Sequence, residues 1–249
     1  MSPSPDSPTR TTSPEPPRST RSPGSSPLPS AEELAALGQR EAARLAVERR
    51  RAAQVDLERA VGRSGIPRRF LDRTFESYLA GTQGQRRALE VCRAYADGFE
   101  RMRERGGGLL LLGGPGTGKT HLACAILAQV IHAGHTGLFL PVSGALRIIR
   151  DAYSPRGQRT ETEALALLTA VDLLVLDEVG VAIGNASTRR AMLFDVLNDR
   201  YGELRPTILI GNLTSAELER YLGERIMERL MDLGSAMVPF TWSSYRRRG

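Results

Sequence analysis

Short apolar runs alternate with amphipathic stretches along most of the chain. The apolar runs are continuous instead of alternating with polar positions, which is typical of parallel strands buried on both faces. They occupy residues 109–112, 137–141, 173–176, 207–210 and 237–242. Amphipathic spacing predicts helices over residues 86–105, 120–133, 144–153, 161–171 and 188–201. The pattern therefore predicts an α/β fold in which a parallel sheet lies between helices.

The first 30 residues have no such pattern. They contain nine of the 15 prolines of the chain and nine serines. Such a composition buries too little apolar surface to offset the entropy lost on ordering. We therefore expect a disordered tail over residues 1–29.

A helical extension is predicted next, over residues 30–63. Ser30 and Glu33 have the spacing of a capping box, which marks a helix N-terminus. Leu34, Leu37 and Leu45 form only a narrow apolar stripe, so the helix would be marginal by itself. The extension is either a docking element for a partner or a solvated linker. The sequence Ser64-Gly65-Ile66-Pro67 ends it.

Composition excludes several classes of protein. Hydrophobic residues make up 41% and charged residues 25% of the chain, and no apolar run approaches the ~20 residues that cross a bilayer. No secretory leader is evident, so we expect a cytoplasmic protein without a membrane partner. Cys92 and Cys124 are too few for a four-ligand zinc site and are expected to pack as small apolar residues. The net charge of +6 and the pI near 9.9 favour an anionic partner.

A glycine-rich segment carries the clearest chemistry. It directly follows a predicted strand, opens a predicted helix and fits the phosphate-loop pattern G-x-x-x-x-G-K-[ST] completely. Glycines let successive backbone N–H groups surround a phosphate, and the helix N-terminus adds its dipole. Lys119 is the single lysine among 34 basic residues, and its compact ammonium suits the β- and γ-phosphates of ATP, while Thr120 offers a hydroxyl to Mg²⁺. The loop reads Gly113-Gly114-Pro115-Gly116-Thr117-Gly118-Lys119-Thr120.

Polar side chains end two further predicted strands. Asp177 and Glu178 follow a buried run, so Asp177 is expected to hold Mg²⁺ through water and Glu178 to polarise the attacking water. A carboxylate at Glu178 separates an ATP hydrolase from a kinase. Asn212 ends the next strand, and its amide is expected to contact both the γ-phosphate and the attacking water. Asp172, which precedes its strand, is expected to cap or solvate the strand start.

Two arginines lie four residues apart on one face of a predicted helix. They are Arg225 and Arg229. One interpretation is that one of them reaches the γ-phosphate of a neighbouring subunit and stabilises charge that develops in the transition state. The alternative is a pair of salt bridges to Glu224 and Glu228.

In this order, these elements resemble the AAA+ ATPases, and among them the DnaC-type replicative helicase loaders, with the IstB-type transposition ATPases as near relatives. The resemblance covers about residues 60–248 and implies an AAA+ ATPase domain over residues 64–249. The Gly-Glu-Arg helix and the Trp-Ser-Ser-Tyr-Arg ending are its most specific parts and favour the loaders. The matching text is Arg63-Ser64-Gly65-Ile66, Phe75-Glu76-Ser77-Tyr78, residues 113–121, 171–180 and 223–229, and Phe240-Thr241-Trp242-Ser243-Ser244-Tyr245-Arg246.

The resemblance implies roles for five residues. Arg229 would be the arginine finger, with Arg225 at the same interface, and Arg246 would be a second sensor that contacts the γ-phosphate in its own subunit. His121 would belong to the nucleotide site. Tyr153 lies where loaders place an aromatic side chain against single-stranded DNA, with a simple loop anchor as the alternative. Nearby basic residues favour the DNA contact: Arg147, Arg150, Arg156 and Arg159.

The function implied is an ATP-hydrolysing, Mg²⁺-dependent switch that loads a hexameric replicative DNA helicase onto single-stranded DNA. Its subunits would assemble into an ATP-dependent spiral or hexamer, and the extension over residues 30–63 would grip the helicase. The nearest alternative is an IstB-like ATPase that binds target DNA for a transposase. A nucleotide-gated adaptor with negligible turnover is disfavoured by Glu178 and the two arginines. A small-molecule kinase is disfavoured because no acceptor pocket is evident.

Overall fold

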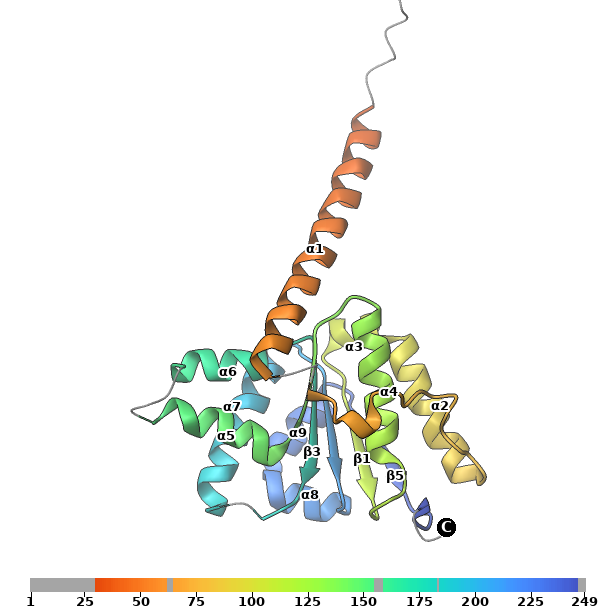
Figure 1. The fold of residues 1–249 in the computed structure, drawn as a ribbon, viewed down its shortest axis with the longest axis vertical. Helices are drawn as coiled ribbons and strands as arrows, with labels where there is room; N and C mark the ends of the chain where they lie inside the picture. Colours follow the sequence, from red (N-terminus) through yellow and green to blue (C-terminus); the bar gives the residue numbers. More distant parts are fainter. Residues whose placement is uncertain (1–29, 62–64, 155–158, 183, 246–249) are drawn as a thin grey trace, which may run out of the picture. The chain divides into compact units, whose positions relative to one another are not determined.

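The computed structural model describes residues 30–61, 65–154, 159–182 and 184–245 (Figure 1). The chain divides into two compact units, Met1–Glu41 and Ala42–Gly249. The first unit, described from Ser30, is helical, and its helix α1 (Ala31–Val61) continues into the second. The predicted helical extension is therefore confirmed as a helix, and Leu37 on it is 54% exposed. The tail predicted for residues 1–29 lies outside the described residues.

The second unit is built on a five-stranded sheet in which every pairing is parallel (Figure 1). The strand order is β2-β3-β4-β1-β5. Because all strands run the same way, their carboxyl ends meet at one edge of the sheet. The bounds are β1 (Leu109–Gly113), β2 (Gly137–Pro141), β3 (Leu173–Val179), β4 (Thr207–Gly211) and β5 (Ala236–Phe240).

Both faces of the sheet are covered by helices, as the continuous apolar runs predicted. Leu109 and Leu111 point into one core and Leu110 and Leu112 into the other, so each residue of the run is buried. The first core includes α2 (Gln83–Asp97), α3 (Phe99–Arg105) and α4 (Lys119–His132). The second core includes α5 (Val142–Ala152), α6 (Glu161–Thr169), α7 (Ala186–Gly202), α8 (Ser215–Leu222) and α9 (Glu224–Asp232).

Apart from shifts of one to three residues at the ends of other elements, the structure differs from the prediction at three places. The single helix predicted over residues 86–105 is wrong, because Gly98 ends α2 and starts α3, which lets both Tyr95 and Phe99 enter the core. The strand predicted over residues 237–242 ends at Phe240, since Trp242 turns toward the phosphate loop. Helix α8 was not predicted, although Thr214 and Glu217 form a capping box at its start.

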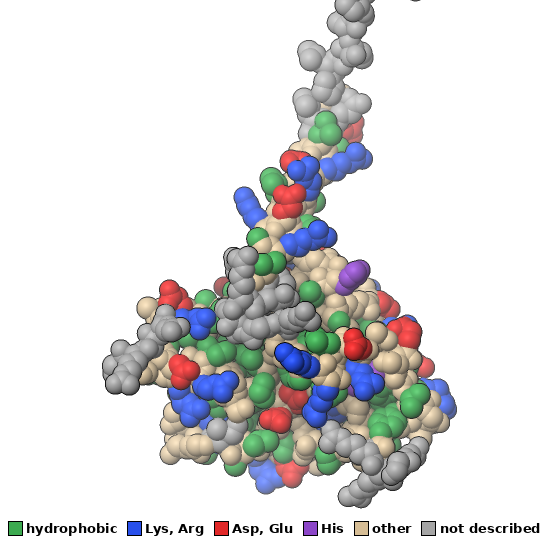
Figure 2. All heavy atoms as spheres, in the orientation of Figure 1, with side chains coloured by type: hydrophobic (Ala, Val, Ile, Leu, Met, Phe, Trp, Pro, Cys, Tyr) green, Lys and Arg blue, Asp and Glu red, His purple; other side chains and the backbone are tan. Residues whose placement is uncertain are grey.

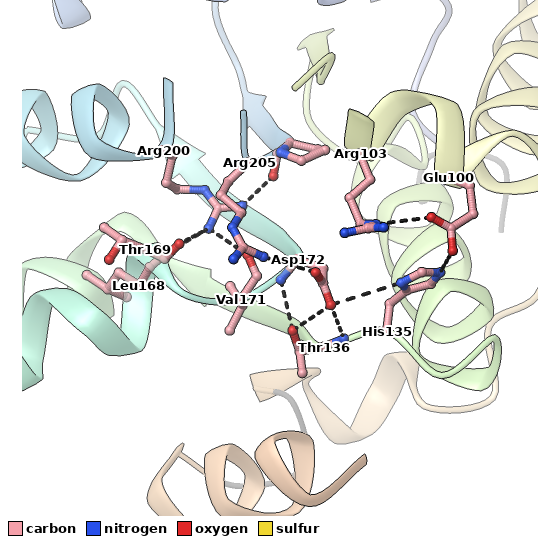
Figure 3. A network of polar contacts seen from close by, with 11 residues as sticks. Glu100, Arg103, His135, Thr136, Leu168, Thr169, Val171, Asp172, Arg200 and Arg205 are labelled. Atoms are coloured by element: carbon pink, nitrogen blue, oxygen red, sulfur yellow. Dashed lines mark hydrogen bonds and ion pairs between the residues drawn. The ribbon is translucent and has the colours of Figure 1, made fainter. Parts of the chain in front are cut away.

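At the amino edge of the sheet, the buried charged side chains Asp172 and Arg200 form hydrogen bonds with other groups of the chain (Figure 3). Asp172 accepts hydrogen bonds from the backbone N–H and the hydroxyl of Thr136, both at 2.9 Å, and from Arg205 at 3.0 Å. Asp172 is 4% exposed, so it does not solvate its strand start. Its carboxylate instead joins that start to Thr136, which precedes β2, and to Arg205. Arg200, 1% exposed, donates to the Thr207 hydroxyl and to the carbonyls of Leu168, Thr169, Val171 and Pro206. Burial lowers the pKa of Arg200 to about 9, which still leaves it charged at pH 7.

The cysteines behave as the composition indicated. Cys92 and Cys124 are buried as free thiols in the first core, and burial raises the pKa of each to about 12. Within the described part of the chain, no three His, Cys, Asp or Glu side chains gather as a metal site would require. Over the same residues, no helix is both long and apolar enough to span a bilayer.

Candidate nucleotide-binding site

The phosphate loop connects β1 to α4 at the carboxyl edge of the sheet. Gly113 has φ +139°, and a Cβ there would lie 2.2 Å from the Phe240 carbonyl oxygen, so no other residue fits. Gly116 and Gly118 have φ +71° and +94°, which L side chains rarely adopt. A Cβ on Gly114 would meet open space. The loop is therefore a backbone cradle in conformations that require glycine, which fits a phosphate group.

Lys119 begins α4 and turns its side chain into this cradle. It is 5% exposed, and its ammonium donates to the carbonyls of Gly113 at 2.7 Å and Gly114 at 2.6 Å. Burial lowers its pKa to about 8, while the nearby Asp177 carboxylate opposes that shift. The buried ammonium thus has neutral loop carbonyls as its hydrogen-bond partners. An anion in the cradle would compensate its charge better.

Thr120 and Asp177 meet across the site. The Thr120 hydroxyl donates to Asp177 Oδ2 at 2.9 Å, which joins the start of α4 to β3. Burial raises the pKa of Asp177, and hydrogen bonds from the Glu178 backbone N–H and from Thr120 pull it back. A hydroxyl and a carboxylate side by side are oxygen ligands of the kind that Mg²⁺ takes beside a nucleotide, so the residues present fit this ion.

Glu178 lies on an irregular turn of β3. The register of β3 against β4 shifts between Leu176 and Val179, and Glu178 itself has φ +60°. The turn is closed by the Val181 N–H, which donates to the Glu178 carbonyl at 3.2 Å. A bulge combined with a left-handed residue re-aims a side chain, and Glu178 is exposed at the strand end. Holding a glutamate in this conformation costs about 1–3 kcal/mol, and such strain is common at functional sites.

Sheet register places Asn212 at the same edge. Gly211, the last residue of β4, pairs with Leu112 on one side and with Val179 on the other. Asn212 follows it directly and is exposed, between the end of the phosphate-loop strand and the turn that carries Glu178. The sequence-predicted residues Lys119, Thr120, Asp177, Glu178 and Asn212 therefore share one edge of the sheet.

Aromatic residues hold the phosphate loop from outside, which sequence reasoning missed. The Thr117 carbonyl accepts from the Trp242 indole N–H at 3.0 Å and from the Tyr78 hydroxyl at 3.4 Å. The Tyr245 N–H donates to the Gly116 carbonyl at 2.9 Å. All three residues lie in segments that carried the family resemblance. The side-chain contacts of Trp242 and Tyr78 are a physical reason for those two aromatics, whereas Tyr245 holds the loop through its backbone and packs its ring edge-on against Tyr78.

The His121 side chain belongs to the same anchor. Its Nε2 lies 2.8 Å from the Thr74 carbonyl and 3.2 Å from the Ser77 hydroxyl, and its ring packs edge-on against Tyr78. Burial lowers the pKa of His121, which favours the neutral ring. Its predicted part in nucleotide binding stays a prediction and would involve its backbone, since the ring is engaged with the 74–78 segment.

The arginine pair lies on α9, which follows the phosphate loop by more than 100 residues in the sequence. The guanidinium of Arg229 donates to Asn198 and stacks over the rings of Phe194 and Tyr201, and Arg225 also lies over Phe194. The alternative of salt bridges within the helix is wrong: in the described ranges neither arginine pairs with Glu224 or Glu228. Arg246, the predicted second sensor, lies outside the described residues.

Tyr153 follows α5 and is 57% exposed, with its hydroxyl bonded to Glu161. Arg147, Arg150 and Arg159 are exposed, and Arg156 lies outside the described residues. On the face shown in Figure 2, basic side chains are interspersed with acidic and hydrophobic ones. The DNA contact of Tyr153 therefore stays a prediction.

Comparison with known proteins agrees with this site. The profile of the family described as IstB-like ATP binding protein matches residues 99–248. The replicative helicase loader DnaC of Escherichia coli (strain K12) is 33% identical over 192 residues, which cover 77% of this chain and 76% of DnaC.

Solved structures agree as well. A crystal structure of the DnaC helicase loader has a TM-score of 0.61 and 26% identity, over 70% of this chain and 99% of that chain. AMPPCP-bound DnaA from Aquifex aeolicus has a TM-score of 0.58 at 22% identity, over 73% of this chain and 53% of DnaA, and shares the fold. With its parallel sheet, phosphate loop and Asp-Glu strand, the chain belongs to the IstB/DnaC family of AAA+ ATP-binding proteins.

Proposed function

We propose that this protein is an ATP-hydrolysing loader of the replicative DNA helicase, which acts in the cytoplasm on single-stranded DNA. The observation that carries the proposal is the 33% identity to the E. coli replicative helicase loader over 77% of the chain. The site supports the ATP-dependent part, because cradle, ammonium, hydroxyl and carboxylates converge at one edge of the sheet.

The residues divide the work of hydrolysis between them. Backbone N–H groups of the loop bind the β-phosphate, and Lys119 exchanges its loop carbonyls for phosphate oxygens. Thr120 and Asp177 hold Mg²⁺, which when bound supplies positive charge to the phosphate oxygens. Glu178 orients and polarises the attacking water, and Asn212 contacts that water and the γ-phosphate.

The site is completed by a second copy of the chain. Arg229, with Arg225 beside it, reaches the γ-phosphate of the neighbouring subunit and stabilises charge in the transition state. Arg246 contacts the γ-phosphate within its own subunit. ATP bound between subunits therefore couples assembly into a spiral or hexamer to the nucleotide state, and Tyr153 faces the enclosed single strand.

Helicase capture is assigned to α1. Leu37 and Leu45 are 54% and 42% exposed and lie on one side of the helix, where they offer an apolar stripe to a partner. Pull-down of the replicative helicase from the same organism tests this proposal. We expect capture by the full chain and loss of capture when residues 1–63 are removed.

A matched pair of full-length variants sharpens the test. Leu37→Glu/Leu45→Glu should abolish capture. Gln39→Glu/Ala46→Glu adds the same number of carboxylates on the opposite side of α1 and should leave capture intact. Capture that survives both the truncation and the leucine variant would contradict the role of α1, and no capture by the full chain would contradict the loader.

DNA preference separates the loader from its relative. A loader bound to ATP should prefer single-stranded to duplex DNA, and Tyr153→Ala should weaken that preference because stacking is lost. The family match to IstB-like proteins is the observation behind the second candidate, an ATPase that binds target DNA. Preference for duplex DNA without helicase capture would favour that candidate.

A further inference from the structure

One face of α7 supports the arginines of α9. Phe194, Asn198 and Tyr201 are spaced by four and three residues, so they line the same side of the helix. All three are half-buried. They belong to none of the phosphate loop, the strand-end carboxylates and the aromatic anchor, so their contacts with α9 call for a separate explanation.

The contacts of this face converge on two guanidinium groups. The guanidinium carbon of Arg229 lies 5.3 Å from the ring centre of Phe194 and 5.2 Å from that of Tyr201. Asn198 Oδ1 accepts a hydrogen bond from the same group. Arg225 lies over the Phe194 ring at 5.5 Å. The Tyr201 hydroxyl donates to Asp232 at 2.7 Å, which fixes this ring against α9.

Stacking leaves an arginine available for phosphate in a way that an ion pair does not. A guanidinium stacks through its flat face, whereas its N–H donors point outward in the plane. A carboxylate partner would occupy those donors and neutralise the charge. Among the residues that the structure describes, Arg229 has two rings and one amide as partners and no carboxylate.

We propose that Phe194, Asn198 and Tyr201 are positioning residues that hold Arg229 and Arg225 in place for the ATP of a neighbouring subunit. The inference rests on the proposed shared site and extends it to the chain that donates the finger. In this proposal the three residues act through the two arginines. They limit the conformations of the arginine side chains before the subunits meet. Less conformational entropy is therefore lost when the guanidinium contacts the neighbour's γ-phosphate.

Mixed assemblies test the proposal, because they separate the chain that binds ATP from the chain that donates arginine. The receiver carries Arg229→Ala and keeps its phosphate loop, and the donor carries Lys119→Ala and keeps its finger. Each is inactive alone. Their mixture should recover ATPase activity at the sites that combine a receiver loop with a donor finger.

Phe194→Leu is then placed in one chain at a time. In the donor it should lower the recovered kcat about 3–10-fold, because it removes the ring over which both Arg229 and Arg225 lie, with the KM for ATP unchanged. In the receiver, whose own finger is already absent, it should change nothing. Phe194→Tyr in the donor keeps a ring face and should restore the rate. Phe70→Leu in the donor removes a different arginine–aromatic stack, that of Arg69, and should also have no effect.

The outcomes are separable. Equal loss of activity from the donor and receiver placements would mean a general structural role and would overturn the inference, as would no loss from the donor placement. If Phe194→Leu proves unstable, Tyr201→Leu compared with Tyr201→Phe asks the same question, since only the first removes the ring. No recovery in the parent mixture, shown to co-assemble, would instead overturn the shared site of the proposed function.

Discussion

The two edges of the sheet carry similar polar side chains, but these side chains serve different purposes. At the amino edge, the buried Arg200 donates to four carbonyls and a hydroxyl of its own chain, and Asp172 is equally engaged (Figure 3). At the carboxyl edge, Lys119 holds two loop carbonyls, while Glu178 and Asn212 are exposed at their strand ends. Polar groups saturated by the chain stabilise the fold, whereas polar groups left open are the ones available to a ligand.

The largest expected effect is on stability and comes from the amino edge. Arg200→Met should lower the free energy of unfolding by about 3–5 kcal/mol, because the acceptors around the guanidinium become buried without a donor. Chemical denaturation followed by circular dichroism measures this. Arg87→Met removes an arginine whose side chain is 76% exposed and should change stability by less than about 0.5 kcal/mol. Equal losses of stability from both variants would show that the polar contacts at the amino edge do not stabilise the fold.

At the carboxyl edge the expected losses are functional. Lys119→Ala should weaken ATP binding by about 100-fold or more with little change in unfolding free energy, because it removes the charge that meets the phosphates. Glu178→Gln should bind ATP normally and fail to hydrolyse it. Equilibrium titration with a fluorescent ATP analogue, together with phosphate release, separates the two. Equal loss of binding in both variants would refute this division of labour.

A smaller effect follows from the pKa of Lys119, which burial lowers to about 8. Phosphate beside the ammonium favours the charged form, so ATP binding should raise this pKa and take up a proton near pH 8. Affinity should accordingly fall as the pH rises above about 8. Calorimetry in buffers of different ionisation enthalpy counts the protons, and the uptake should be smaller at pH 7, where the amine is already charged. Proton release at pH 8 would contradict the assignment.

The smallest effect concerns backbone strain. At φ +60°, Glu178 adopts a conformation that glycine accepts more readily than any L side chain. Glu178→Gly should therefore be about 1 kcal/mol more stable than Glu178→Ala, although both lose hydrolysis. Thermal unfolding of the two variants makes the comparison. If the two variants have the same free energy of unfolding, the backbone at residue 178 is not strained.

The sequence allowed the prediction of whatever depended on local pattern. The five strands were predicted because their apolar runs are continuous, although the edge strand β5 leaves three of its five residues exposed. The phosphate loop was predicted because its glycines are required by the local backbone. Asp177 and Glu178 were predicted for the same reason, because they end an apolar run downstream of a phosphate loop, and their roles stay predictions.

Other features depended on contacts between distant segments. Trp242 and Thr117 are 125 positions apart, and nothing near either one indicates their hydrogen bond. Arg200 was one of many arginines on a helix, and only the fold reveals its burial. The break at Gly98 and the capping box at Thr214 were visible locally but were outweighed by the apolar spacing around them.

The anchoring of Trp242 has an optical consequence. It is the single tryptophan of the chain, and its indole N–H donates to the carbonyl of Thr117, inside the phosphate loop. Indole emission responds to the polarity and hydrogen bonding of its surroundings, and no second indole contributes a background signal. The protein thus carries its own fluorophore at the loop, and we expect nucleotide exchange to change the emission of the unlabelled chain.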